Sequence, residues 1–285
     1  MAEPLLLPRR RGVLRAPLRT LGDALRAYVL IARLWMRAIA SYRASFWILA
    51  VSGFLTTGLD FVAILVFFTR IDTLGGFGLR EIAFLYGASG IGLAVGDMFV
   101  GRIERLGRMI REGSLDAMLL RPVPLLAQVC ADEFTPRRLA RVLQAGGVFA
   151  WGCGAVDWTP GRAGTTAVML ICSMAIFSGL FVAMASLQFW TSESAEFANA
   201  FTYGGNTITQ YPLSIFPGEV VKAITFGLPI AFVNWYPALS VLGRPDPFGL
   251  PARLQHAAPA AAVAVLVLAG LVWRAGVRHH RSTGS

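Results

Sequence analysis

Few residues in this 285-residue chain have the type and spacing that enzyme chemistry requires. The three histidines, His256, His279 and His280, lie far along the chain from most carboxylates, and neither an H-E-x-x-H nor a G-x-S-x-G motif occurs. Glu112 and Asp116 are close in sequence, but a charged loop provides no pocket for an acid–base pair. We therefore predict that the chain performs no catalysis, with a membrane-embedded enzyme acting on lipids as the open alternative.

Motifs for cofactors and metals are absent as well. The only lysine, Lys222, is followed by Ala223, whereas a phosphate-binding P-loop needs Gly-Lys followed by Ser or Thr. Cys130, Cys153 and Cys172 lack metal-ligand spacing, and we expect them to pack as small apolar side chains. The chain is therefore expected to bind neither cofactor nor metal. If ATP drives this protein, another polypeptide must bind it.

Polar residues that interrupt apolar segments are candidates for a transport pathway. Asp60 lies in the middle of an apolar run, where a carboxylate usually faces the interior of a helix bundle or a cavity. It can attract a cationic substrate, pair with an arginine of a partner subunit or serve a structural hydrogen bond. The other pathway candidates are Asn206, Gln210, Pro229 and Asn234.

Three further polar features have local interpretations. The stretch 191–218 is either a surface loop or a cytoplasmic turn leading into a broken segment at membrane depth, where irregular backbone needs protein or water beside it. Pro229 is expected to kink a span. Asp97, near the end of an apolar run, is expected to pair with Arg102.

The composition places all these residues in an integral membrane protein. Hydrophobic residues make up 55% of the chain, charged residues 15%, and the mean hydropathy is +0.60, whereas soluble domains carry about 25% charged residues. The net charge of +10 reflects an excess of arginine. In a membrane protein this excess indicates cytoplasmic loops rather than nucleic-acid binding.

Six apolar runs are long enough to be spans, given about 20 residues per crossing. They cover residues 46–68, 81–100, 142–157, 165–190, 220–242 and 258–275. Arginines gather before residue 44, in the loop 101–141 and in the tail, and are sparse in 69–80, 158–164 and 243–257. Both termini and the 101–141 loop are therefore predicted to be cytoplasmic. Residues 20–45 combine an apolar stripe with arginines, which predicts an amphipathic helix in the membrane interface.

The 101–141 loop begins with a pattern for two short helices. Gly113 is a natural helix stop, Ser114 is expected to cap a second helix, and Asp116 lies in its first turn. Leu115, Met118 and Leu119 are expected to form one apolar face. Arg121-Pro122 ends the helix, because a residue before proline avoids helical geometry. The result is a helix–break–helix element suited to docking in a cleft.

The sequence of this element carries a resemblance to a known family. Residues 110–122, I-R-E-G-S-L-D-A-M-L-L-R-P, resemble the cytoplasmic motif of ABC-2 type permeases, in the six-span branch of bacterial ABC export systems. Residues 211–216, Y-P-L-S-I-F, the pair Thr225-Phe226 and residues 229–237, P-I-A-F-V-N-W-Y-P, resemble the fifth-span region of the same family. The two motifs, the spans and the amphipathic lead-in cover nearly the whole chain in the family's order.

The resemblance implies a coupling helix that docks on a nucleotide-binding subunit. The residues carried over for ATPase coupling are Arg111, Glu112, Gly113, Leu115, Asp116, Leu119, Leu120, Arg121 and Pro122. The implied partners are two ABC ATP-binding subunits, which hold ATP and magnesium, a second permease copy or related permease, and membrane lipids. The family also places short re-entrant helices outside, between spans five and six, although residues 243–257 are too broken to indicate them.

We therefore expect an all-α polytopic membrane protein with six transmembrane helices, an interface helix and a coupling helix. The expected divisions are a leader with the interface helix at 1–45, a permease domain at 46–275 with its coupling loop at 101–141, and a cytoplasmic tail at 276–285. The expected function is the permease of an ABC-type exporter in the bacterial cytoplasmic membrane. A channel or secondary transporter is the second alternative, although no internal repeat supports it.

Overall fold

The computed structural model describes residues 43–121, 123–131, 136–191 and 194–280. Apart from one isolated bridge between Leu74 and Phe77, the regular structure of these residues is helical, as expected. The predicted interface helix lies almost entirely in residues 1–42, which are outside the described part of the chain, as is Pro122.

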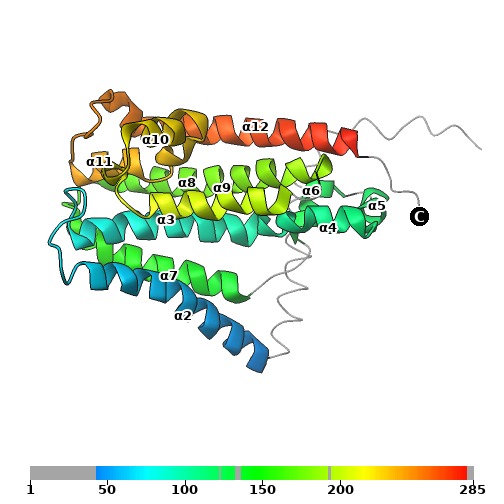
Figure 1. Ribbon diagram of the computed structural model, residues 1–285, viewed down its shortest axis with the longest axis horizontal. Coiled ribbons are helices and arrows are strands. Elements are labelled where there is room, and N and C mark those ends of the chain that lie inside the picture. The colour runs from blue at the N-terminus through cyan, green and yellow to red at the C-terminus, as the bar shows by residue number, and fades with distance from the viewer. Residues whose placement is uncertain (1–42, 122, 132–135, 192–193, 281–285) are drawn as a thin grey trace, which may run out of the picture.

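The longer helices form a bundle along the long axis of the molecule (Figure 1). They are α2 (Arg43–Phe67), α3 (Leu79–Val100), α7 (Pro136–Gly152), α8 (Pro160–Ser186), α9 (Ser194–Thr209) and α12 (Ala258–His279). The short helices α4 (Leu106–Arg111), α5 (Ser114–Leu119) and α6 (Leu125–Ala131) lie toward one end, here named the α5 end. Helices α10 (Gly218–Lys222) and α11 (Trp235–Leu242) lie at the opposite end, the α11 end.

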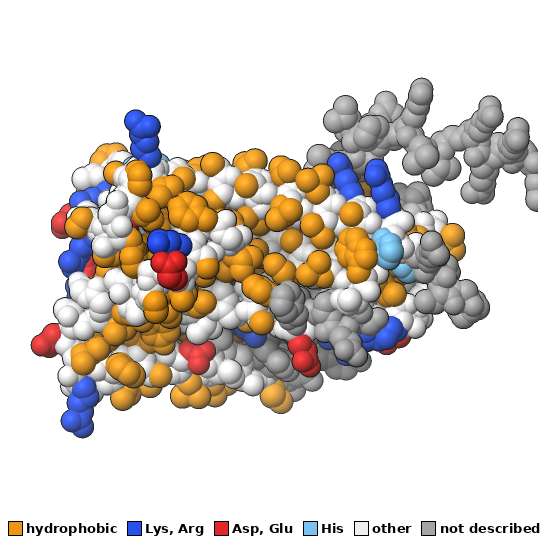
Figure 2. Space-filling view, turned by 45° about the horizontal axis from the view of Figure 1, so that its top comes forward, with side chains coloured by type: hydrophobic (Ala, Val, Ile, Leu, Met, Phe, Trp, Pro, Cys, Tyr) orange, Lys and Arg blue, Asp and Glu red, His pale blue; other side chains and the backbone are white. Residues whose placement is uncertain are grey.

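Length and apolarity identify three helices within the described residues as candidate membrane spans. These are Leu79–Arg111, Pro160–Phe189 and Ala258–His279, and a bent pair over 218–242 raises the number to four if it counts as one span. The predicted spans 81–100, 165–190 and 258–275 thus correspond to apolar helices. On the face shown in Figure 2, apolar side chains cover the middle of the bundle, which suits a hydrocarbon environment.

The remaining predicted spans form helices with weaker signals. Val51–Phe67 of α2 is a shorter apolar helix, and α7 covers 17 residues. A total of six spans is therefore not confirmed by length and composition and stays a prediction.

The predicted span over 220–242 is broken at the position where a kink was expected. Its two halves, Gly218–Gly227 and Pro229–Leu242, are bent by 78°. Residues Ala223–Gly227 form a π-helical turn, Leu228 is extended with φ −116° and ψ 104°, and a 3₁₀ turn covers Pro229–Phe232. Pro229 explains the break, since it lacks an amide hydrogen and pushes the preceding residue out of helical geometry. The expected kink at Pro229 is thus confirmed, but it is a sharp break.

The polar stretch 191–218 contains a regular helix, α9, which ends at Thr209, so the irregular backbone expected there is confined mainly to 210–217. Polar side chains of α9 form hydrogen bonds within the helix and to the neighbouring helix α3. The Thr207 hydroxyl donates to the Tyr203 carbonyl at 3.1 Å, and the Asn206 side-chain oxygen accepts from Ser89 of α3 at 2.8 Å. The first bond lies within α9, and the second, which is buried, holds α9 beside α3. Irregular backbone follows in 210–217 and within 218–242.

Close helix packing around α3 depends on glycine. A β-carbon on Gly87 of α3 would approach the Phe149 backbone of α7 to 2.5 Å, and one on Gly152 of α7 would collide with the Phe84 backbone of α3. Small residues let helix backbones approach closely in a membrane. The α3–α7 contact therefore requires glycine at both positions, while Gly146 of α7 faces open space.

Two of the three cysteines are buried, Cys130 and Cys172, while Cys153 is half-buried, and all three are free. Burial raises the pKa of the Cys130 thiol to about 12. At neutral pH this thiol is therefore a protonated, unreactive group that packs as a small apolar side chain, as expected from the sequence.

Alanine substitutions at these glycines test the α3–α7 packing. We expect Gly87→Ala and Gly152→Ala to lower stability by about 1–3 kcal/mol, because an inserted methyl group overpacks the contact. Gly146→Ala is the matched control on α7, and it should leave stability unchanged or raise it by up to about 1 kcal/mol through helix propensity. Thermal unfolding of the purified protein in detergent measures all three. Equal melting temperatures for the three variants would contradict this account of the packing.

Candidate functional site

The element around residues 101–121 has the helix–break–helix form expected from the sequence. A 3₁₀ turn over Gly101–Arg105 continues α3 into α4, and Gly113 then breaks the helix with φ +69°. Because side chains strain the backbone at positive φ, glycine fits this position best. The predicted stop at Gly113 is therefore confirmed, and α5 turns back from it at the end of the bundle (Figure 1).

The first turn of α5 differs from the prediction at Ser114. Asp116 lies in this turn as expected, but Ser114 is already helical and does not cap the helix. Its hydroxyl instead donates to the Met109 carbonyl at 3.3 Å. Gly113 takes the cap position in the left-handed conformation, so no extended residue is left to act as a side-chain cap.

The apolar residues of α5 point in two directions, contrary to the single face expected. Leu115 is fully buried and Met118 is half-buried, whereas Leu119 is 46% exposed and Leu120 88% exposed. Gln128 of α6 fixes the inner side by donating to the carbonyls of Met118 and Val123. We name the exposed residues Arg111, Glu112, Leu119, Leu120 and Arg121 the docking tip. Leu115 supports this tip from inside.

The end of α12 is attached to α5 through His280. Its Nε2 lies 2.9 Å from a carboxylate oxygen of Asp116, and its side chain is only 8% exposed. The His280 ring also contacts Phe189 edge to face, and neighbouring His279 stacks on Trp190. The last described residues therefore hold the docking element against the bundle.

A buried charge cluster lies between the docking element and the helices. Asp97 of α3 is 2% exposed and forms ion pairs with Arg138 at 3.2 Å and Arg141 at 3.3 Å, both on α7. These ion-pair partners differ from the expected Arg102, which acts on the Asp97 charge more weakly and lines the same cavity of about 200 Å³ together with Glu104. Pairing is what permits a carboxylate to be buried at this depth.

Three of the five pathway candidates come together in a polar pocket between α2 and α9. Asp60, Asn206 and Gln210 line a volume of about 250 Å³, with side chains from α3 and α7 closing it. The Asp60 side chain is exposed, and its carboxylate makes no hydrogen bond or ion pair with any described residue.

The other two candidates, Pro229 and Asn234, lie outside this pocket. Asn234 is 1% exposed, and its amide donates to the carbonyls of Leu85 and Thr209 at 2.9 and 2.6 Å. It therefore ties the broken segment to α3 and α9. Pro229 sets the bend of that segment. Both residues therefore shape the fold of the broken segment and do not line the polar pocket.

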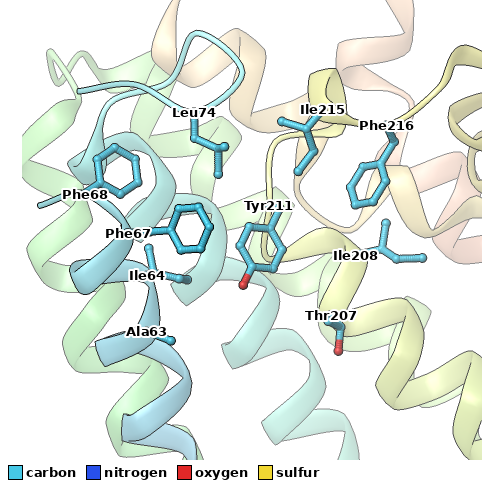
Figure 3. A pocket seen from close by; sticks show the side chains of 10 residues that line it. All are labelled: Ala63, Ile64, Phe67, Phe68, Leu74, Thr207, Ile208, Tyr211, Ile215 and Phe216. Atoms are coloured by element: carbon cyan, nitrogen blue, oxygen red, sulfur yellow. The ribbon is translucent and has the colours of Figure 1, made fainter. Parts of the chain in front are cut away.

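An apolar pocket continues the polar one toward the α11 end and escaped the sequence reasoning. Its volume is about 470 Å³, and it shares Thr207 with the polar pocket. Figure 3 shows apolar side chains of α2 facing those of α9 and the following turn. The lining consists of Ala63, Ile64, Phe67, Phe68, Leu74, Thr207, Ile208, Tyr211, Ile215 and Phe216. The sequence signal that could have indicated this lining is the helical spacing of Asp60, Ile64 and Phe67, which places them on one face of α2.

Comparison with known proteins gives one match. The sequence model of a family described as ABC-2 family transporter protein matches residues 54–284, which is most of the chain. The match confirms the resemblance carried by residues 110–122 and 211–237. No curated protein and no solved structure matches the chain.

Removing the buried carboxylate tests the charge cluster. Asp97→Asn leaves Arg138 and Arg141 without their partner, and we expect a loss of about 3 kcal/mol in the free energy of unfolding. The control is Glu219→Gln, which breaks an exposed pair with Lys222 (3.0 Å) and should cost less than about 1 kcal/mol. Unfolding curves in detergent compare the two. Similar losses in both variants would show that the Asp97 pairs are not needed for stability.

Removing the His280 ring tests the attachment of α12 to α5. Loss of a bond worth about 1 kcal/mol should raise the amide exchange rate of residues 114–119 about fivefold in His280→Ala. His279→Ala is the control, since its ring contacts Trp190 and not Asp116. Hydrogen–deuterium exchange with mass spectrometry reports the rates. Unchanged exchange in His280→Ala would mean that the contact does not hold α5.

Proposed function

We propose, since the chain belongs to the ABC-2 family of transporter proteins, that it is the membrane-spanning permease subunit of an ABC-type exporter. The docking tip carries this proposal. It places an exposed leucine pair beside charged side chains at one end of the bundle, and Leu120 at 88% exposure has no apolar environment within the described chain. An exposed apolar residue rimmed by charges marks an interaction site.

The partner that fits the docking tip is an ATP-hydrolysing subunit. A transporter of this family needs ATP, and the chain lacks a P-loop because its single lysine precedes alanine. Two ATP-binding subunits would hold ATP and magnesium and receive the tips of two permease chains, either two copies or a related pair. The permease itself would perform no chemistry and bind no nucleic acid.

The proposed topology keeps six spans but assigns the fifth differently from the sequence. Helices α2, α3, α7, α8, α9 and α12 are the spans, because Figure 1 shows all of them running along the bundle axis. The bent pair over 218–242 then forms a re-entrant element at the α11 end, between spans five and six. In this proposal the α5 end and both termini face the cytoplasm of a bacterial cell, and the arginine placement supports this orientation.

Two connections would transmit motion from the docking tip into the bundle. The 3₁₀ turn over Gly101–Arg105 joins the tip to α3, and the Asp116–His280 contact joins it to α12. Nucleotide-driven movement of the tip would thereby shift α3 and α12 together. The pathway in this proposal is the pocket between α2 and α9, where Asp60, Asn206 and Gln210 meet, while Pro229 and Asn234 shape the helices around it.

A charge placed on the docking tip tests this function. Leu120→Asp should abolish co-purification of an ATPase with the chain and the associated Mg-ATP hydrolysis, because a carboxylate cannot enter an apolar groove without a large penalty. Leu120→Met is the matched control, which keeps an apolar side chain and should retain both. The measurement is affinity purification from membranes, with mass spectrometry to identify a partner that has its own P-loop.

The folded state of Leu120→Asp is checked by its melting temperature, which should equal that of the wild type because the residue is exposed. Transport activity in a wild-type chain that carries no ATPase would overturn the permease proposal. If Leu120→Asp still co-purifies with the full amount of ATPase, the docking tip is not the ATPase-binding surface.

A further inference from the structure

We propose that the groove between α2 and α9 binds an amphipathic cation, with the positive group at Asp60 and the apolar body between Phe67 and Tyr211. The groove consists of the polar and apolar pockets that share Thr207. This inference rests on the proposed transport function and names the chemical class of its substrate.

The first support is the order of side chains along α2. Thr56, Thr57 and Asp60 line the polar pocket, and Ala63, Ile64 and Phe67 line the apolar pocket. Since residues three and four apart share one face of a helix, these six residues form one stripe. The stripe changes from polar to apolar one turn after Asp60, and Phe67 lies about 10 Å further along the axis.

Helix α9 and the turns that follow it form the opposite wall with a similar change of polarity. Tyr203 and Asn206 of α9 line the polar pocket, Thr207 lines both pockets, and Tyr211 and Ile215 beyond the helix line the apolar one. In Figure 3 the rings of Phe67 and Tyr211 face the same space from the two walls. The groove is therefore polar toward the α5 end and apolar toward the α11 end on both sides, which is the pattern of an amphipathic ligand.

The sign of the ligand's charge follows from the charged side chains of the groove. Among the described residues, Asp60 and Arg141 are the two charged side chains that line the polar pocket. The guanidinium of Arg141 is engaged elsewhere, by the Asp97 carboxylate at 3.3 Å, which it shares with Arg138, and by the face of the Tyr203 ring at 5.9 Å. The Asp60 carboxylate has no ion-pair partner among the described residues. A carboxylate within a span costs about 2.5–3.5 kcal/mol on insertion scales. A bound cation recovers part of this cost, and an anion increases it.

The size of the ligand follows from the apolar pocket. Its volume of about 470 Å³ lies within the usual range of about 300–1,000 Å³ for sites of drug-sized molecules. Phe67, Phe68, Tyr211 and Phe216 supply ring surfaces, which attract cations and stack on aromatic ligands. The two pockets together therefore select a compact aromatic or aliphatic molecule with one positive group.

Two probes of the same shape and opposite charge test the inference. Radiolabelled tetraphenylphosphonium and tetraphenylborate are compared in equilibrium dialysis against the purified full-length chain in nanodiscs of neutral lipid. We expect the wild-type chain to bind the phosphonium with saturation and the borate at least about tenfold more weakly. Asp60→Asn should weaken phosphonium binding at least about tenfold and remove the preference for the cation.

Two controls separate charge from general damage. Asp72→Asn removes an exposed carboxylate of the 68–78 loop that lines neither pocket, and its binding should equal that of the wild type. Ala63→Trp should fill the apolar pocket and weaken phosphonium binding, whereas Ala264→Trp on the exposed face of α12 should not. Melting temperatures confirm that the variants are folded.

Three results would overturn the inference. The first is that the wild-type chain shows no saturable binding of the phosphonium, and the second is that Asp60→Asn binds it as tightly as the wild type does. The third is that light scattering finds a dimer for the wild type and a monomer for Asp60→Asn. The last result would assign Asp60 to a contact between two copies of the chain. Because no ATPase is present in this assay, failure here leaves the permease proposal intact, and that proposal fails only in the co-purification experiment.

Discussion

The paired charges at the α5 end are the interaction on which the two functional regions depend. Asp97 holds Arg138 and Arg141 to α3, and the cavity that these three residues line also contains Arg102 and Glu104 from the turn that leads to the docking tip. Arg141 in addition lines the polar pocket beside Asp60. A buried carboxylate thus fixes the base of the coupling element, and it holds the Arg141 guanidinium toward Asp97 at the edge of the polar pocket.

Local sequence signals predicted the structure well where the cause is itself local. Gly113 stops a helix because its own backbone is left-handed, and Pro229 breaks one because it lacks an amide hydrogen. The apolar runs that became α3, α8 and α12 needed only length and composition. Hydropathy carries no information on direction, so Pro229 indicated a kink within 218–242 but not that the bend reaches 78°.

Long-range contacts account for what the sequence did not predict. The Asp116–His280 pair joins residues separated by 164 positions, and Asp97 found its partners on α7 instead of at nearby Arg102. The polarity of 191–218 suggested a loop or a broken segment. In the structure the Ser89 hydroxyl of α3 donates to the Asn206 side chain, so this polar residue is accommodated within helix α9. Asp60, Asn206 and Gln210, which the sequence singled out as pathway candidates, line one pocket, while the apolar pocket beside them could not be foreseen without the relative position of the two helices.

The position of His280 bears on how this protein can be handled. The ring lies against Phe189 and Asp116, so the end of the described chain is beside the docking tip. In the proposed assembly, a purification tag or fluorescent protein joined directly after His280 would compete for the space of the partner subunit. The 243–257 connection at the α11 end, with exposed Pro245 and Pro251, is remote from that surface. Insertion of an epitope there leaves the assembly face unobstructed.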